Sequence, residues 1–439
     1  MSDTVNWDRF KREVPRWYTE AKLGIFVHWG LYSVPAWAEI NVGEAGTIEK
    51  AQMFTHNPYA EWYGNTSRVE GSPAREHHKK VHGDAPYIDF LDQWKAENFN
   101  PDQWAELFAH SGAQYVIPTA KHHEGVTLWP APGIGNLNTV DRGPKRDLIG
   151  DIASAVRKKG LHFGVYYSGG IDWSISYAIP HSYEHAPGWR PLDAAYSMYC
   201  YQHVVDLIDR YKPEVIFNDI NWPDFAKREG DYSLPALFDY YYSQVPTGVV
   251  NDRFGVPHSD YKTSEYKFNL HHESEGVWEN NRGIGFSFGY NQLETEEQYL
   301  NITGLLHHFV DIVSRGGNLL LNVGPKASGE IPELQQKVLR QLGDWMKKNS
   351  KAIYASKSVL EFTPSDLPWV RWTGVNHEVF AHIDSTGITT FEVPEELVDD
   401  STAHYLSGER AIFTRNGNTI TIDIDENHSP MAVISFRRR

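Results

Sequence analysis

Eight short apolar runs, each ending in polar or aromatic residues, recur along the first three quarters of the chain. They cover residues 23–30, 113–123, 161–170, 214–222, 248–254, 260–266, 283–291 and 318–325. The first, second, fourth and eighth runs are nearly continuous in Val, Ile, Leu and Phe, which is typical of strands buried on both faces of a parallel sheet. The sixth run is weak and would not be assigned to a strand on its own.

Amphipathic helix patterns precede four of these runs, and a fifth pattern follows the last one. They cover residues 101–112, 145–160, 197–212, 296–317 and 332–349, and the first two close with a glycine, as helix C-termini often do. No helix pattern is visible after the fifth and sixth runs. Strands that alternate with helices favour the α/β class, and eight strands favour a (β/α)8-like barrel, irregular in places, over residues 1–352.

The pattern changes in the remaining residues, 353–439. From about residue 355, short alternating runs with turn signals replace the helical period. This change predicts a C-terminal antiparallel β-sandwich. Asn416-Gly417 lies between two such runs and predicts a type I′ hairpin turn.

Length, charge and cysteine content narrow the class of protein. A chain of 439 residues is longer than one ordinary hydrophobic core accommodates, in agreement with two domains. The formal net charge of −16 argues against a nucleic-acid partner, because such binding needs a basic surface. Cys200 is the only cysteine, so neither an intrachain disulfide nor a multi-cysteine metal site can form. The charged start and the lack of long apolar segments predict a cytoplasmic protein without a membrane partner, and the oligomeric state stays open.

Polar and aromatic side chains gather where the predicted strands end. In a barrel of parallel strands these C-terminal ends form the active site. Any one such residue can equally be a structural group at the rim, whereas the whole set favours a pocket. The set consists of His28, Trp29, His122, His123, Tyr166, Tyr167, Asn218, Asp219, Asp252, Arg253, Glu265, Phe286, Phe288 and Asn322.

Two carboxylates in this set suit acid–base chemistry. Asp219 follows the buried run at residues 215–217, and Glu265 follows the run at residues 262–264. Asp219 on its own could equally cap the turn that follows it. Glycoside hydrolysis needs two facing carboxyl groups, one as acid and one as nucleophile or base, so the pair is a candidate for that chemistry.

Metal and nucleotide chemistry have less support. The histidine pairs at 122–123, 271–272 and 307–308 are adjacent, and neighbours on a strand point to opposite faces. The chain has no HExxH motif, no GxxxxGK[ST] loop and no GxGxxG sequence after a strand. We therefore expect neither a metal nor another cofactor.

Eight segments stand out together along the predicted barrel. They are WYTEAKLGIFVHWGLYSVPAWAE (17–39), NPYAEWY (57–63), AKHHEG (120–125), GVYYSGGIDWS (164–174), YKPEVIFNDINWP (211–223), VVNDRFGVPHSDYKTSEY (249–266), RGIGFSFGYN (282–291) and GGNLLLNVGP (316–325). In content and in order they resemble glycoside hydrolase family 29, the α-L-fucosidases. A match of this whole series is far more specific than any single motif.

The resemblance implies roles residue by residue. Asp219 in FNDINWP matches the catalytic nucleophile, and Glu265 in DYKTSEY resembles the acid/base of bacterial members. The acid/base position varies across the family, and Ser264 stands where Pro or Ala is usual. The neighbouring alternatives for the acid/base are Asp260, Glu273, Glu275 and Glu279. The positions that match sugar contacts are His28, Glu61, Trp62, His122, His123, Tyr166 and Arg253, and Phe288 resembles the aromatic wall beside the fucose methyl group.

The resemblance therefore implies a retaining exo-α-L-fucosidase that acts by double displacement without a cofactor. Its expected substrates are fucosylated oligosaccharides or glycoconjugates. A hydrolase for another galacto-configured sugar and a catalytically silent carbohydrate-binding protein are the alternatives. Neither the linkage preference nor the tolerance for branched substrates follows from the sequence.

Overall fold

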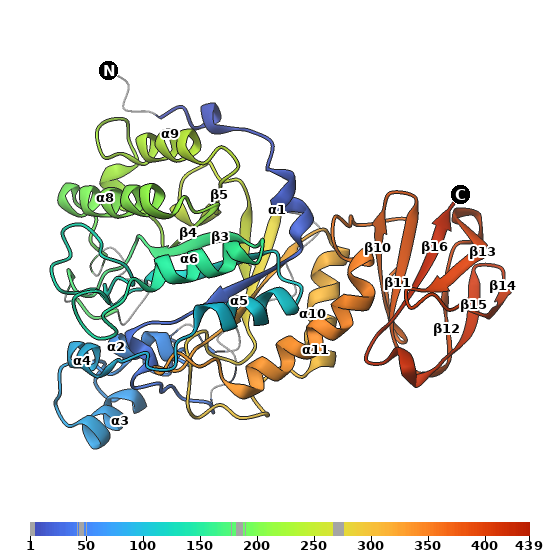
Figure 1. Cartoon of the computed structure of the whole chain (residues 1–439), viewed down its shortest axis with the longest axis horizontal. Helices are drawn as coiled ribbons and strands as arrows, with labels where there is room; N and C mark the ends of the chain where they lie inside the picture. Colours follow the sequence, from blue (N-terminus) through green and yellow to red (C-terminus); the bar gives the residue numbers. More distant parts are fainter. Residues whose placement is uncertain are drawn as a thin grey trace.

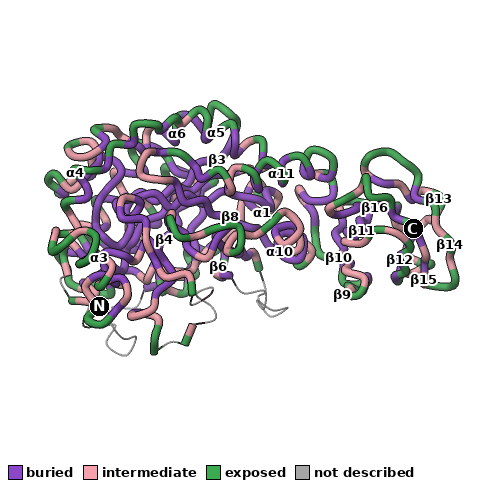
Figure 2. Tube along the Cα trace, turned by 90° about the horizontal axis from the view of Figure 1, so that it is seen from below, coloured by how far each residue is buried: buried purple, intermediate pink, exposed green. Residues whose placement is uncertain are grey.

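A computed structural model of the chain describes residues 5–41, 43, 48–49, 51–176, 178–180, 188, 190–266 and 276–439. A larger N-terminal part, with a central sheet surrounded by helices, lies beside a smaller C-terminal part made of strands (Figure 1). Buried chain runs through the middle of the larger part and exposed chain lies at its periphery (Figure 2).

The central sheet has eight strands in the order β5-β4-β3-β2-β1-β8-β7-β6, and every neighbouring pair is parallel. Among the described residues, one isolated parallel bridge between Asn251 and Tyr261 joins its two edge strands. The expectation of an irregular, barrel-like α/β fold is therefore confirmed. The strands are β1 (Leu23–Val27), β2 (Tyr115–Lys121), β3 (His162–Ser168), β4 (Val215–Asp219), β5 (Val249–Val250), β6 (Lys262–Glu265), β7 (Trp278–Gly283) and β8 (Asn318–Val323).

Most long helices around the sheet begin at a side-chain cap. Asn100, Asp147, Asp193, Ser233 and Asn301 each accept a hydrogen bond from a backbone N–H three residues further on, which satisfies a donor that the first turn leaves free. The α-helices are α1 (Arg16–Ala21), α2 (Tyr63–Thr66), α3 (Pro73–His82), α4 (Phe90–Gln93), α5 (Pro101–His110), α6 (Leu148–Lys158), α8 (Ala194–Tyr211), α9 (Leu234–Gln244), α10 (Ile302–Ser314) and α11 (Glu333–Asn349). The five predicted helices correspond to α5, α6, α8, α10 and α11, whereas α9 has no predicted counterpart.

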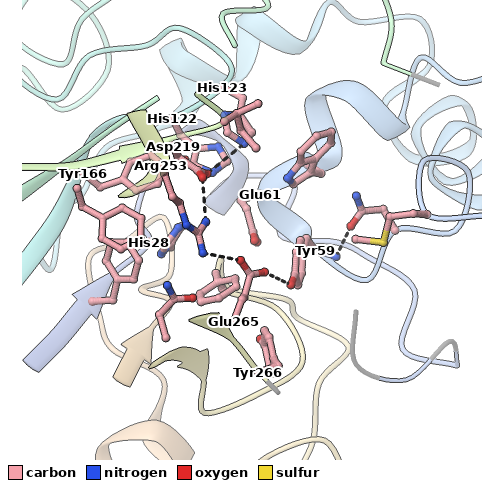
Figure 3. Close-up of a pocket in the computed structure, with 18 of the residues that line it drawn as sticks. His28, Tyr59, Glu61, His122, His123, Tyr166, Asp219, Arg253, Glu265 and Tyr266 are labelled. Atoms are coloured by element: carbon pink, nitrogen blue, oxygen red, sulfur yellow. Dashed lines mark hydrogen bonds and ion pairs between the residues drawn. The ribbon is translucent and has the colours of Figure 1, made fainter. Parts of the chain in front are cut away.

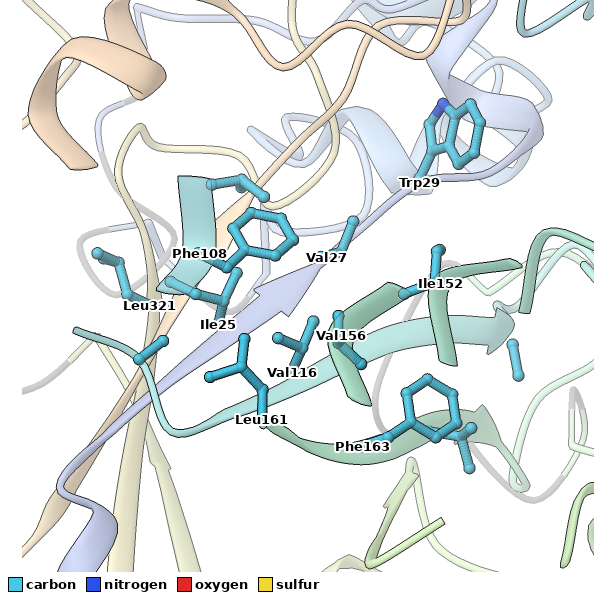
Figure 4. Packing of buried hydrophobic residues seen from close by; sticks show 14 of the residues in the cluster. Ile25, Val27, Trp29, Phe108, Val116, Ile152, Val156, Leu161, Phe163 and Leu321 are labelled. Carbon is cyan, nitrogen blue, oxygen red and sulfur yellow. The ribbon is translucent and has the colours of Figure 1, made fainter. Parts of the chain in front are cut away.

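In most strands of the sheet, alternate residues build two different layers of the core. Ile25 and Val27 of β1 face outward, whereas Phe26 between them faces the barrel interior with Ile117 of β2. In the outer layer the strands pack against α5 and α6 (Figure 4). Phe108 from α5 and Ile152 and Val156 from α6 are among the residues of that layer.

The seventh strand lies at a different place from the predicted one. The prediction of a strand at 283–291 is wrong, because β7 ends at Gly283 and the residues after it form a loop. β7 reads WENNRG, and all six residues are buried. Its polar side chains find partners inside the fold: Asn280 Nδ2 donates to Ser264 Oγ (2.7 Å), and His308 Nε2 donates to Asn280 Oδ1 (2.8 Å). A pattern of apolar positions cannot reveal such a strand.

Glu279 of β7 is a buried carboxyl group, and its titration should be visible in protein stability. The hydroxyls of Tyr18 (2.9 Å) and Tyr115 donate to its Oε2. Burial raises the pKa of Glu279 to about 7 in the folded protein, although the hydrogen bonds oppose the shift. Because the folded state then binds the proton more tightly than the unfolded state, stability falls as the pH rises from about 4.5 to about 7. The total loss is about 3 kcal/mol.

Glu279→Gln should remove this loss, since an amide does not titrate. Urea unfolding of the variant and of the wild type at pH 5 and at pH 8 gives two stability differences. We expect the free energy of unfolding of the variant, relative to the wild type, to be higher at pH 8 than at pH 5 by up to about 3 kcal/mol. The exposed Glu97→Gln serves as the matched control. A stability difference between the wild type and the variant that is the same at both pH values would contradict the prediction.

The C-terminal strands form two antiparallel sheets that share one core. The first sheet has the order β13-β16-β11-β10-β9 and the second has the order β12-β15-β14, as expected for a sandwich. The strands are β9 (Ser365–Asp366), β10 (Trp369–Val375), β11 (Glu378–Asp384), β12 (Gly387–Glu392), β13 (Val398–Tyr405), β14 (Phe413–Asn416), β15 (Thr419–Ile424) and β16 (Ala432–Arg438). The prediction that the two domains divide after residue 352 stays a prediction, since Phe380 and Met431 pack into the core of the larger part.

The β14–β15 hairpin is present, but its turn is displaced by one residue from the predicted one. Asn416 pairs with Thr419, so the two turn residues are Gly417 and Asn418. Gly417 has a φ of 58°, whereas Asn418 is not among the residues with positive φ, and a type I′ turn needs positive φ at both. The prediction of a type I′ turn at Asn416-Gly417 is therefore wrong.

Candidate active site

A cavity of about 280 Å³ lies at the C-terminal ends of the barrel strands. Pockets for drug-sized ligands usually occupy about 300–1,000 Å³, so this cavity suits a single sugar ring. The residues to which the resemblance gives a catalytic or sugar-binding role all line it, and several point toward one another in Figure 3. They are His28, Glu61, Trp62, His122, His123, Tyr166, Asp219, Arg253, Glu265 and Phe288.

Asp219 is the last residue of β4, and its carboxylate is held from two sides. The Tyr166 hydroxyl donates to Oδ2 (2.8 Å), and Arg253 Nη1 donates to Oδ1 (2.9 Å). Burial, together with the nearby Asp219, raises the pKa of Tyr166, so the phenol keeps its proton and remains a donor. These contacts fix the orientation of Asp219 in a cavity wall where only 12% of its side chain is exposed.

Glu265 ends β6 and is more accessible, with 33% of its side chain exposed. Arg253 Nη2 donates to Oε2 (3.2 Å), and the Tyr59 hydroxyl donates to Oε1 (2.5 Å). Arg253 therefore contacts Asp219 and Glu265 at the same time, as the dashed lines in Figure 3 show. Two carboxyl groups from strands four and six thus face one cavity.

Arg253 belongs to a one-turn 3-10 helix (Asp252–Phe254) that follows the short strand β5. Its Nε donates to Thr263 Oγ1 (3.0 Å), and that hydroxyl donates to Asp252 Oδ1 (2.8 Å). Burial lowers the pKa of Arg253, but the coulombic attraction of Asp219 and Glu265 outweighs it and raises the pKa overall. The guanidinium therefore keeps its positive charge between the two carboxyl groups.

Two of the alternative acid/base residues lie away from the cavity. Asp260 pairs with Arg12 (2.9 Å) and accepts a hydrogen bond from the Val250 backbone N–H. Glu279 lies inside the barrel with Tyr18 and Tyr115. Glu273 and Glu275 lie outside the described residues.

His122 and His123 line the cavity together, contrary to the expectation that adjacent residues point to opposite faces. The alternation of a strand does not apply to them, because β2 ends at Lys121. His28 and Trp29 also lie beyond the end of their strand, β1, but they point to opposite sides. His28 lines the cavity, while Trp29 packs among Trp and Phe side chains of the outer core.

Several strand-end residues named from the sequence support the site from behind. Tyr167 contacts His203, Asn218 donates to the backbone of Asn221 and Arg253, and Asn322 contacts His28. Asn218 thus holds loop backbone, Asn322 holds the ring of His28 in the cavity wall, and Tyr167 contacts helix α8. Those that do not line the cavity are Trp29, Tyr167, Asn218, Asp252, Phe286 and Asn322.

Other cavity residues were not anticipated from strand ends. Tyr59 stands in a long segment before α5 that has no periodic pattern, and Tyr266 follows β6 directly. The rings of Tyr59, Tyr266 and Phe288 form one apolar cluster. The unanticipated lining residues are Phe26, Met53, Phe54, Asn57, Tyr59, Phe217, Ile220, Tyr266 and Asn281.

The loop that carries Phe288 is fastened by two acidic side chains. Glu61 accepts hydrogen bonds from Ser287 Oγ (3.1 Å) and the Gly289 backbone N–H (2.7 Å), and Glu294 accepts one from the Ser287 N–H (2.8 Å). Burial raises the pKa of Glu294 to about 8, although backbone hydrogen bonds oppose the shift. Glu61 thus joins the short helix at Ala60–Trp62 to the aromatic wall.

No group of three or more His, Cys, Asp or Glu residues in the described part of the chain is arranged to hold a metal ion. In the same residues, no helix combines the length and the apolar character needed to cross a membrane.

Comparisons of the sequence and of the structure with known proteins agree with one another, and each covers most of the chain. A sequence model described as Alpha-L-fucosidase matches residues 2–351. The α-L-fucosidase of Dictyostelium discoideum is 32% identical over 402 residues, covering 89% of this chain and 81% of that protein. The crystal structure of Thermotoga maritima α-fucosidase with a mechanism-based inhibitor is 42% identical, with a TM-score of 0.88 and coverage of 98% of this chain and 99% of that one. The same Thermotoga enzyme in complex with fucose is 41% identical, with a TM-score of 0.86 and coverage of 97% of each chain.

Proposed function

The chain belongs to the α-L-fucosidase family, and we propose that it releases terminal α-L-fucose by a retaining, double-displacement mechanism. Asp219 is the proposed nucleophile and Glu265 the proposed acid/base. The observation that carries this assignment is the contact of Arg253 with both carboxylates across one cavity. Retaining glycosidases need two carboxyl groups close enough to act on opposite sides of one glycosidic bond.

In the first step an oxygen of Asp219 attacks C1 of the fucosyl ring as the bond from C1 to the leaving oxygen breaks. Glu265 gives its proton to that oxygen, so the leaving group departs as an alcohol and not as an alkoxide. In the second step Glu265 takes a proton from water, the water oxygen attacks C1, and the bond to Asp219 breaks. Two inversions at C1 leave the configuration unchanged.

The shape of the cavity supports an exo-acting enzyme with a preference for fucose. A volume of about 280 Å³ admits one ring, so the cleaved sugar is a terminal one. Phe288, with Tyr59 and Tyr266 around it, supplies an apolar wall for a methyl group, worth about 1 kcal/mol. An α-L-galactoside carries a hydroxyl on the corresponding carbon, which would lie against this apolar wall.

The proposed function is tested with matched aryl glycosides and by the configuration of the first product. We expect the aryl α-L-fucoside to exceed the aryl α-L-galactoside in kcat/KM by about 10- to 100-fold, because an unpaired buried hydroxyl costs about 1–3 kcal/mol. Proton NMR during the first minutes should show α-L-fucose before mutarotation. Equal rates on the two sugars would refute the fucose preference, and β-L-fucose as the first product would refute retention.

A further inference from the structure

Two histidines of the cavity have their Nδ1 atoms bound to polar side chains whose own hydrogen bonds are fixed. The first is His28, whose Nδ1 lies 2.7 Å from Asn322 Oδ1. Asn322 Nδ2 donates to the carbonyl oxygen of Phe288 (2.7 Å). Because a carbonyl oxygen can only accept, this contact determines which end of the amide is Nδ2. The other end, Oδ1, can only accept, so the proton in the contact with His28 belongs to the imidazole Nδ1.

The second is His123, whose Nδ1 lies 2.7 Å from Ser168 Oγ. Ser168 has one hydroxyl proton and donates it to the carbonyl oxygen of Ile171 (2.7 Å). Its oxygen is therefore left as an acceptor toward the imidazole. The proton in this contact also belongs to Nδ1.

We propose that Asn322 and Ser168 are positioning residues that hold His28 and His123 as neutral rings protonated on Nδ1. Each ring then presents the lone pair of its Nε2 to a hydroxyl of the bound sugar, which must act as the donor. The proton positions follow from this chain alone, whereas the sugar as the ligand rests on the proposed function.

The surroundings of both rings keep them uncharged. Burial lowers the pKa of His28 and of His123 well below the usual value, and the neighbouring His122 lowers both further. His123 Nε2 lies 4.0 Å from Asp219 Oδ2. A neutral ring without a proton on Nε2 donates no hydrogen bond to Asp219. Arg253 and Tyr166 both donate to that carboxylate instead.

His122 offers a comparison within the same cavity. Its Nδ1 has no hydrogen-bond partner in the described part of the chain, and its nearest carboxylate oxygen, Glu124 Oε2, is 3.6 Å away. No acceptor in that part of the chain lies at hydrogen-bond distance from Nδ1 of His122, so the position of its proton does not follow from the structure. The inference therefore concerns His28 and His123 and leaves His122 aside.

A neutron crystal structure of the perdeuterated, ligand-free enzyme measures the proton positions without any reference to activity. We expect deuterium on Nδ1 of His28 and His123, and on Nδ2 of Asn322 toward Phe288. The Nε2 atoms of both rings should carry none. Deuterium on Nε2 of either ring would overturn the assignment for that ring and for its partner.

Kinetics with aryl α-L-fucosides that each lack one hydroxyl tests whether the two partners act through the rings. On the parent fucoside, Ser168→Ala should lower kcat/KM by about 10-fold, because the ring is no longer held as an acceptor. Ser168→Thr, which keeps the hydroxyl, should restore most of the rate. On one deoxy substrate, Ser168→Ala and the wild type should differ by less than about two-fold, since the hydroxyl that His123 binds is already missing.

Asn322→Leu should behave in the same way with a different deoxy substrate, because His28 binds a different hydroxyl. Thermal unfolding identifies any variant that has lost its fold, and the neutron structure of the wild type then decides the proposal for that residue. An equal fractional loss on every substrate would show a purely structural role and overturn the proposal. A wild type that is inactive on the parent fucoside would refute the proposed function instead, and the neutron result would still decide the proton positions.

Discussion

Asp219→Gly is expected to lose several orders of magnitude in kcat on an aryl α-L-fucoside, with the fold intact. Asp219 is the group that forms the covalent bond to C1, so no other residue can replace it in the first step. Arg253 keeps its contact with Glu265 in the variant, and Tyr166 loses one acceptor. Added azide fits the space left by the carboxylate and should attack C1 from that face, which gives β-L-fucosyl azide. Steady-state kinetics and NMR of the azide product measure both effects.

The isosteric variant Asp219→Asn is the matched control. It should be as slow as the glycine variant, because an amide is a poor nucleophile, yet azide should give it little help since the space remains filled. Near-native hydrolysis by Asp219→Gly would falsify the assignment of the nucleophile. An α-configured azide product would show that azide did not attack from the Asp219 side of the sugar, which would also contradict the assignment.

The fold could be predicted where burial is carried by apolar side chains. β1, β2 and β8 are buried along their whole length and read as apolar runs, so their positions follow from the sequence. β7 is buried to the same degree, but it is polar and is satisfied by contacts with residues distant in the chain, such as Glu279 with Tyr18. Such tertiary contacts leave no periodic signal along the strand itself.

The site could be predicted where a strand delivers the residue. Asp219 is the last residue of β4 and Tyr166 lies two residues before the end of β3, and parallel strands bring their C-terminal ends to one edge. Tyr59 reaches Glu265 from a segment without regular pattern, so neither strand alternation nor helix period points to it. The resemblance to the family, rather than periodicity, identified Glu61 and Trp62 from the same segment.

Glu265→Gly is expected to separate substrates by their leaving groups. Loss of the proton donor harms the departure of a basic alcohol most, whereas an activated aryl leaving group needs little protonation. We expect a loss of several orders of magnitude on a fucosyl oligosaccharide and a much smaller one in the first step on a dinitrophenyl fucoside. The glycosyl-enzyme on Asp219 should then accumulate, because no base activates water. Rates for a series of aryl fucosides of increasing leaving-group pKa measure the effect.

Azide distinguishes this variant from Asp219→Gly. It needs no general base, so it should attack the glycosyl-enzyme from the face opposite Asp219 and yield α-L-fucosyl azide. Tyr59→Phe is the matched control: it removes the hydrogen bond to Glu265 Oε1 and keeps the carboxyl group, so it should retain the hydrolytic route and gain little from azide. Equal losses for all leaving groups, together with no effect of azide, would place the acid/base elsewhere. Glu273 and Glu275 would then be next in line, because Glu279 lies inside the barrel beside Tyr18 and Tyr115.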